Sequence, residues 1–99
     1  MNRGESRYTE EEFFILKEIF FGKLSRNKNY ELFLQPRMRE LHRRAIYLRG
    51  LGEFLAKNRG NFWSEQRGDS VVIQLVKPEL DFDAVIFLSI EEWELIAPK

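Results

Sequence analysis

The fold is decided by the stretch LGEFLAKNRGNFWSEQRGDSVVIQLV, residues 51–76, in which the hydrophobic period changes at Gly60. Before that glycine, apolar residues recur at the spacing of three and four residues that is typical of a helix. After it, two β-prone runs flank a short polar link containing Gly68, which indicates a hairpin. The stretch therefore predicts a short helix that ends near residues 58–60, followed by two antiparallel strands.

A first helix is expected well upstream of this stretch. Thr9 and Glu12 have the spacing of a capping box, and Tyr8 and Phe13 lie where a hydrophobic staple forms. These signals predict a helix over residues 10–21. Its apolar residues cover more than half of its circumference, so we expect it to be central in the fold.

A second helix is expected to begin at Pro36, because proline fits the first helical position. The helix is predicted over residues 36–49, and Gly50 and Gly52 are expected to interrupt it. Its apolar stripe consists of Met38, Leu41, Ala45 and Leu48. Residues 23–35 fit either a short strand or a helical turn.

A third strand and a short helix are expected after the hairpin. Residues 84–90, AVIFLSI, are apolar on both faces, which predicts a strand that is central or buried by another subunit. Ser89 and Glu92 repeat the capping-box spacing and predict a terminal helix. The order of elements predicts a single α+β domain, residues 1–99, with helices packed on a small antiparallel sheet. Residues 1–7 are expected to be disordered.

Composition narrows the classes of function. The chain has 99 residues and no cysteine, which excludes disulfides, thiolate nucleophiles and cysteine-based zinc sites. No secretory signal or membrane-spanning run is visible, so we expect an intracellular, cytoplasmic protein with no membrane partner, and a nuclear location is also compatible with the sequence. Net charge is zero, but residues 22–59 carry ten basic and three acidic groups, whereas residues 60–99 carry three and eight. This asymmetry points to a charged partner.

The residues from Leu41 to Val76 resemble the second half of a winged-helix domain, with short helices separated by glycine and then a two-stranded wing. Within that class the pattern is similar to LOTUS, or OST-HTH, domains over about residues 8–76, and residues 77–99 lie outside it. The resemblance implies a winged-helix-like fold with an extra C-terminal strand and short helix. It also implies binding of RNA or helicase partners, and for winged helices generally contact with DNA or with protein.

Residues 37–49, RMRELHRRAIYLR, set five arginines against one glutamate. One glutamate cannot neutralise five guanidinium groups, so the surplus must meet water, the acidic last third of the chain, or an external anion. One interpretation is a solvated face balanced by Glu79, Asp81 and Asp83. The other is nucleic-acid binding, with Tyr47 stacking on an unpaired base and phosphate contacts from Arg39, Arg43, Arg44, Arg49, Arg59 and Arg67.

Other chemistry has less support in the sequence. His42 is the only histidine, and no motif places a nucleophile beside it. Glu79, Asp81 and Asp83 could offer oxygen ligands to Mg²⁺ or Ca²⁺, but the EF-hand spacing and glycine are absent, which favours an acidic loop. The tripeptide Arg67-Gly68-Asp69 is interpreted as a hairpin turn. We therefore predict no catalytic residue, no metal site, no cofactor and no enzymatic activity.

The sequence thus predicts a small binding module that contacts a nucleic-acid backbone, or an acidic protein surface, through a basic helix and the hairpin tip. The alternative is a homodimeric interaction or structural subunit that binds no nucleic acid, with Val85, Phe87 and Trp93 at its interface. A metal-dependent phosphodiesterase that uses the three carboxylates of residues 79–83 is a third hypothesis.

Overall fold

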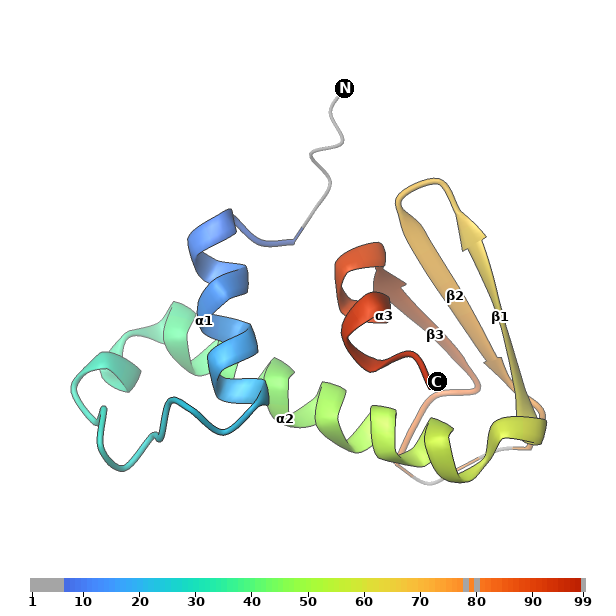
Figure 1. Ribbon diagram of the computed structural model, residues 1–99, viewed down its shortest axis with the longest axis horizontal. Coiled ribbons are helices and arrows are strands. Elements are labelled where there is room, and N and C mark those ends of the chain that lie inside the picture. Colours follow the sequence, from blue (N-terminus) through green and yellow to red (C-terminus); the bar gives the residue numbers. More distant parts are fainter. Residues whose placement is uncertain (1–6, 78, 80, 99) are drawn as a thin grey trace. The chain divides into compact units, whose positions relative to one another are not determined.

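The computed structural model describes residues 7–77, 79 and 81–98, and these form an α+β protein (Figure 1). They build three α-helices, two short 3₁₀ helices and one three-stranded antiparallel sheet, so the predicted α+β class with a small antiparallel sheet is confirmed. Two compact units share the long second helix: an N-terminal unit, Tyr8–Gly50, and a C-terminal unit, Leu51–Lys99 with Arg7. The expected disorder of residues 1–7 falls, except for Arg7, outside the described residues.

The N-terminal unit begins with helix α1, Glu10–Phe20. Its capping box is present as expected, because the Thr9 hydroxyl accepts from the Glu12 N–H at 3.0 Å and the Glu12 carboxylate accepts from the Thr9 N–H at 3.0 Å. Leu16 and Ile19 are buried, but the Phe14 side chain is 58% exposed. Only part of the apolar surface of α1 is therefore buried by the described residues, and its expected central place in the fold stays a prediction.

The ambiguous segment 23–35 forms turns and then the 3₁₀ helix η2, Leu32–Leu34. Of its two interpretations, the helical turn is confirmed and the strand is not. Phe33 is buried to 2% exposure, whereas Leu34 on the same turn is 54% exposed. Phe33 thus anchors the segment in the core of the unit.

Helix α2 runs without a break over Pro36–Lys57, so the expected interruption at Gly50 and Gly52 is wrong. Glycine costs a helix about 1 kcal/mol relative to alanine, but it breaks no backbone hydrogen bond. Here the apolar stripe continues through the glycines, and Leu51 and Leu55 are fully buried. A Cβ on Gly52 would lie 3.2 Å from the Ile96 Cβ, so this glycine permits close packing rather than ending the helix.

The sheet of the C-terminal unit has the order β1-β2-β3, with β1 at Phe62–Arg67, β2 at Ser70–Leu75 and β3 at Val85–Ser89. The β1–β2 hairpin is confirmed, with Arg67 opposite Ser70 and Gly68 at a φ of +61°. That left-handed φ is the conformation for which two-residue hairpin turns use glycine.

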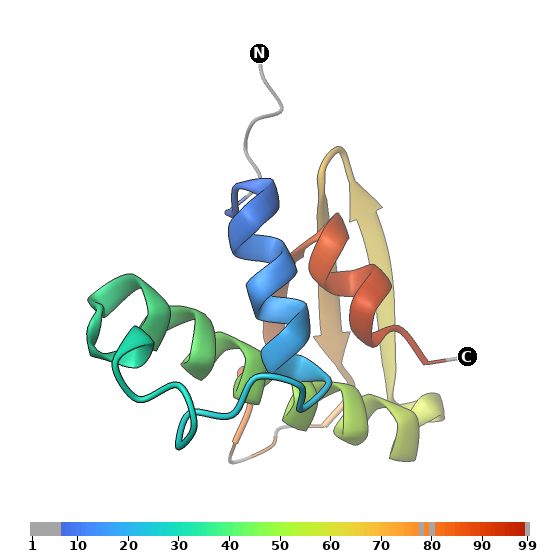
Figure 2. The ribbon, with the colours of Figure 1, turned by 60° about the vertical axis from the view of Figure 1, so that its left-hand side comes forward.

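Strand β3 lies at an edge of the sheet, so of the two predicted alternatives the central strand is wrong and burial by another subunit stays a prediction. Its apolar residues divide between two faces: Ile86 and Leu88 are buried, whereas Val85 and Phe87 are 41% and 59% exposed. Helix α3, Ile90–Ile96, packs on the buried face with the predicted Ser89 and Glu92 capping box (Figure 2). Although strand β3 is apolar on both faces, only one of its faces therefore covers the core of this unit.

Candidate functional site

The arginines of α2 differ in their partners, and Arg37 contacts two carboxylates. Its Nε and Nη2 donate to the two oxygens of Glu12, both at 2.9 Å, and its Nη1 donates to Glu40 at 3.1 Å. The bonds from Arg37, followed by the Thr9 N–H, lower the pKa of Glu12 from 4.5 to about 2. Glu12 in turn raises the pKa of Arg37 above its ordinary value. This arginine is part of the packing of α1 on α2.

Arg39 and Arg43 lie on another side of the same helix and have no such partner. The Arg39 Nη1 donates to the backbone carbonyl of Leu34 at 2.8 Å, which fixes its position without neutralising its charge. Neither arginine, nor the exposed Arg26 of the preceding loop, forms an ion pair with any residue from 7 to 77, 79 or 81 to 98. These guanidinium groups are therefore available to an external anion.

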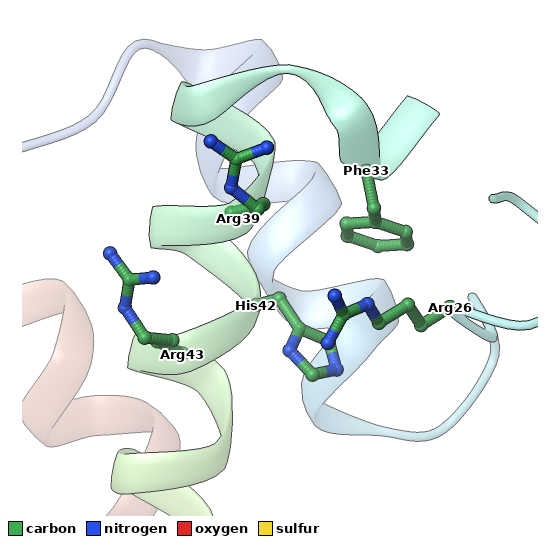
Figure 3. A pocket seen from close by; sticks show the side chains of 5 residues that line it. All are labelled: Arg26, Phe33, Arg39, His42 and Arg43. Atoms are coloured by element: carbon green, nitrogen blue, oxygen red, sulfur yellow. The ribbon is translucent and has the colours of Figure 1, made fainter. Parts of the chain in front are cut away.

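These three arginines line a pocket of about 130 Å³ together with Phe33 and His42 (Figure 3). Arg39 and Arg43 extend from α2, and the Arg26 side chain reaches toward the His42 ring from the loop before η2. None of the described residues that line the pocket carries a carboxylate. Its lining therefore carries a charge of three positive groups before any ligand binds.

His42 is positioned by Phe33. Their ring centroids are 5.4 Å apart and the rings meet edge to face at 68°. Burial, and then the charge of Arg26, lower the pKa of His42 from its ordinary value of 6.5, so the imidazole is neutral at pH 7. A neutral imidazole offers one N–H donor to a ligand. Three arginine side chains and one imidazole donor thus border the pocket above an apolar floor, and the Arg39 and Arg43 guanidinium groups, which extend away from Arg26 in Figure 3, would turn inward to contact the same anion.

The remaining residues predicted to bind nucleic acid are less well placed. Arg44 is half-buried and its guanidinium lies 5.0 Å from the centre of the Tyr47 ring, so one face of that tyrosine is already covered. Arg67 pairs with Glu65 at 3.2 Å on β1. Arg49 on α2 and Arg59 on the 3₁₀ helix η3, Arg59–Asn61, are exposed. Arg59 and Arg67 belong to the C-terminal unit, whereas the pocket belongs to the N-terminal unit.

The residues predicted for a dimer interface all lie in the C-terminal unit. Val85 and Phe87 are exposed on the sheet face opposite α3, and Trp93 on α3 is half-buried. Trp63 of β1 lies on the same outer face as Phe87, because Trp63 pairs with Gln74 and Val72 pairs with Phe87 along β2. Its side chain is 62% exposed. The outer sheet face thus carries several exposed apolar side chains.

The acidic residues Glu79, Asp81 and Asp83 are exposed. In the described part of the chain, no group of three or more His, Asp or Glu side chains is placed to hold a metal ion. None of its helices is both long and apolar enough to cross a membrane.

The sequence reasoning found Arg39 and Arg43 but did not include Arg26, Phe33 or His42 among the binding residues. Arg26 lies in the segment whose conformation was left open, so its distance from α2 could not be predicted. A signal was present in part, because His42 follows Arg39 by three residues and therefore lies beside it on a helix. The role of Phe33 depends on the turn that buries it.

Comparisons of the chain with protein-family models, with curated proteins and with solved structures found no match. The arrangement of charged side chains in the N-terminal unit therefore carries the functional argument.

Proposed function

We propose that this protein is a non-enzymatic binding module that contacts the phosphate backbone of a nucleic acid through Arg26, Arg39 and Arg43. One observation carries the proposal: three guanidinium groups line one pocket, and none is paired with a carboxylate of the described residues. Arginine binds phosphate well because its planar donors match two phosphate oxygens at once. Arg49, farther along α2, supplies a further contact.

The position of these arginines supports a ligand-binding role rather than a structural one. The first turn of α2 contains no acidic residue, although the positive end of a helix dipole favours acidic side chains there. Arg39 and Arg43 are four residues apart, where like charges destabilise a helix by about 0.2–0.5 kcal/mol. The arrangement costs stability in the free protein, and bound phosphates would remove that cost.

The hairpin tip contributes less to the proposed surface than the helix. Arg67 already has a carboxylate partner in Glu65, although both side chains are well exposed and such pairs are weak. Arg44 covers one face of the half-buried Tyr47 ring, so we do not assign base stacking to this tyrosine. We therefore place backbone contact on α2 and its preceding loop.

The test is the salt dependence of binding to generic single-stranded RNA, single-stranded DNA and duplex DNA, measured by fluorescence anisotropy from low salt upward. Affinity should fall steeply as salt rises, because each neutralised phosphate releases counterions. The double variant Arg39→Gln, Arg43→Gln should lose two contacts and flatten the slope of log K against log salt by about 1.4 for single strands or 1.8 for duplex.

The matched control is the double variant Lys57→Gln, Lys77→Gln, which removes the same charge from exposed positions of the C-terminal unit. It should change the slope by much less than the arginine pair. Absence of binding at low salt, or equal slopes for the two double variants, would contradict the proposal. Equally tight binding to polyglutamate would assign the surface to an acidic protein partner instead.

A homodimer is the second candidate function, and the exposed outer face of the sheet favours it. Phe87 lies on edge strand β3 with 59% of its side-chain surface exposed, beside the exposed Val85. Sedimentation should then report a concentration-dependent dimer that Phe87→Glu dissociates. Phe14→Glu is the control, because Phe14 is equally exposed but lies on α1. A monomer at high concentration would exclude this candidate.

A further inference from the structure

The pocket has room for a single anionic group. Sites for drug-sized ligands typically measure about 300–1,000 Å³, whereas this pocket measures about 130 Å³. Phe33 cannot act as a stacking platform for a base, since its side chain is only 2% exposed and its ring meets His42 edge to face. The donors that remain are the guanidinium groups and the His42 imidazole.

The charge of the pocket distinguishes two forms of phosphate. A phosphate inside a strand is a diester with one negative charge, whereas a terminal phosphate monoester carries about −1.5 to −2 at pH 7. The described lining residues include three guanidinium groups and no carboxylate. Their positive charge exceeds the single negative charge of a phosphate diester. A monoester also presents three terminal oxygens, which gives acceptors to three separate arginines.

The rest of α2 offers a path for the strand beyond that phosphate. Arg49 follows His42 by seven residues, so it lies on nearly the same side of the helix, about 10 Å farther along the axis. Its side chain is exposed, and it forms no ion pair within the described part of the chain. A ligand with a second phosphate would reach it, whereas a peptide with one phosphorylated side chain need not.

We propose that the pocket formed by Arg26, Phe33, Arg39, His42 and Arg43 binds the terminal phosphate of a nucleic-acid strand, with the strand continuing along α2 toward Arg49. This inference rests on the proposed function and specifies its ligand. The protein then recognises strand ends in preference to internal backbone. The bond of Arg39 to the Leu34 carbonyl occupies one of its guanidinium donors and leaves the others for a phosphate.

The experiment uses eight-nucleotide single strands of one sequence in two pairs: 5′-phosphate against 5′-hydroxyl, both labelled at the 3′ end, and 3′-phosphate against 3′-hydroxyl, both labelled at the 5′ end. Fluorescence anisotropy should show at least a tenfold tighter complex for one phosphorylated end than for the hydroxyl strand. Arg26→Gln and His42→Gln should each remove most of that difference. Arg49→Gln should weaken the phosphorylated and hydroxyl strands by the same factor and leave their ratio unchanged.

The possible outcomes distinguish a failure of this inference from a failure of the proposed function. Equal, salt-dependent binding of phosphorylated and hydroxyl strands overturns the end-specific pocket and leaves backbone binding intact. Absence of binding to all strands overturns both. A phosphoserine peptide that binds as tightly as the phosphorylated strand overturns the nucleic-acid assignment. Because Arg26 lies on an exposed loop, its variant tests the pocket even where His42→Gln disturbs folding, which circular dichroism would report.

Discussion

Helix α2 carries arginines on two sides, and an arginine of one side is paired with carboxylates whereas those of the other side line a pocket. On one side Arg37 makes three hydrogen bonds to Glu12 and Glu40 and holds α1 against α2. On the other, Arg39 and Arg43 line a pocket without a carboxylate partner among the described residues. Two residues along a helix turn the side chain by about 200°. The comparison shows that a run of arginines can combine structural and ligand-binding positions within one helical turn.

The largest expected effect comes from the structural side. Arg37→Gln should lower the free energy of unfolding by about 1 kcal/mol, because it removes a bidentate ion pair whose partners are 42% and 28% exposed and hence partly screened. Urea denaturation at pH 7 measures the change. The same variant should bind nucleic acid with little change in salt slope. A slope change as large as that of Arg39→Gln, Arg43→Gln would remove the distinction between the two sides.

A second prediction concerns how the stability contributed by the Glu12–Arg37 pair depends on pH. The pKa of Glu12 is about 2 in the folded protein and 4.5 ordinarily, so the unfolded chain binds more protons between these values. The stability from the Glu12–Arg37 pair is therefore fully present above pH 4.5 and lost as pH falls toward 2. The difference in unfolding free energy between the wild type and Arg37→Gln should shrink over this window in parallel urea series. A difference that stays constant down to pH 2 would contradict this role of Glu12.

The smallest expected effect concerns Arg43, on the pocket side of α2, and it increases the free energy of unfolding instead of lowering it. Arg43→Gln should raise the free energy of unfolding by about 0.2–0.5 kcal/mol, because it relieves repulsion from Arg39 four residues earlier. Arg49→Gln is the control, since Arg49 has Glu53 four residues on and should not gain stability. A loss of stability in Arg43→Gln would mean that Arg43 has a structural role in the free protein.

Local signals predicted the elements of the fold well. The capping boxes at Thr9 and Ser89 and the hairpin at Gly68 depend on residues within a few positions of each other, and all are confirmed. The two predictions that are wrong, the break in α2 and the central position of β3, depend on longer-range packing. Gly52 appeared to end a helix, but its missing side chain makes room for Ile96. Strand β3 appeared central because it is apolar on both faces, yet its place in the sheet depends on the strands that pair with it.

For the candidate site, the sequence predicted the two arginines that share a helix side and missed the residues brought there by a loop. Helical spacing places Arg39 and Arg43 together without any tertiary contact. Arg26 and Phe33 reach the pocket through turns whose conformation depends on the burial of Phe33. Sequence spacing carries no information of that kind.

The amino-acid sequence alone determined the helix starts, the hairpin, the α+β class and the excess of positive charge in the central part of the chain, because each depends on neighbours along the chain or on composition. The tertiary structure decided which arginines are paired. Only packing brings Glu12 to Arg37, and only the loop before η2 brings Arg26 to His42. Whether a charge is neutralised depends on distances of a few ångströms between distant residues, and those distances are set by the fold.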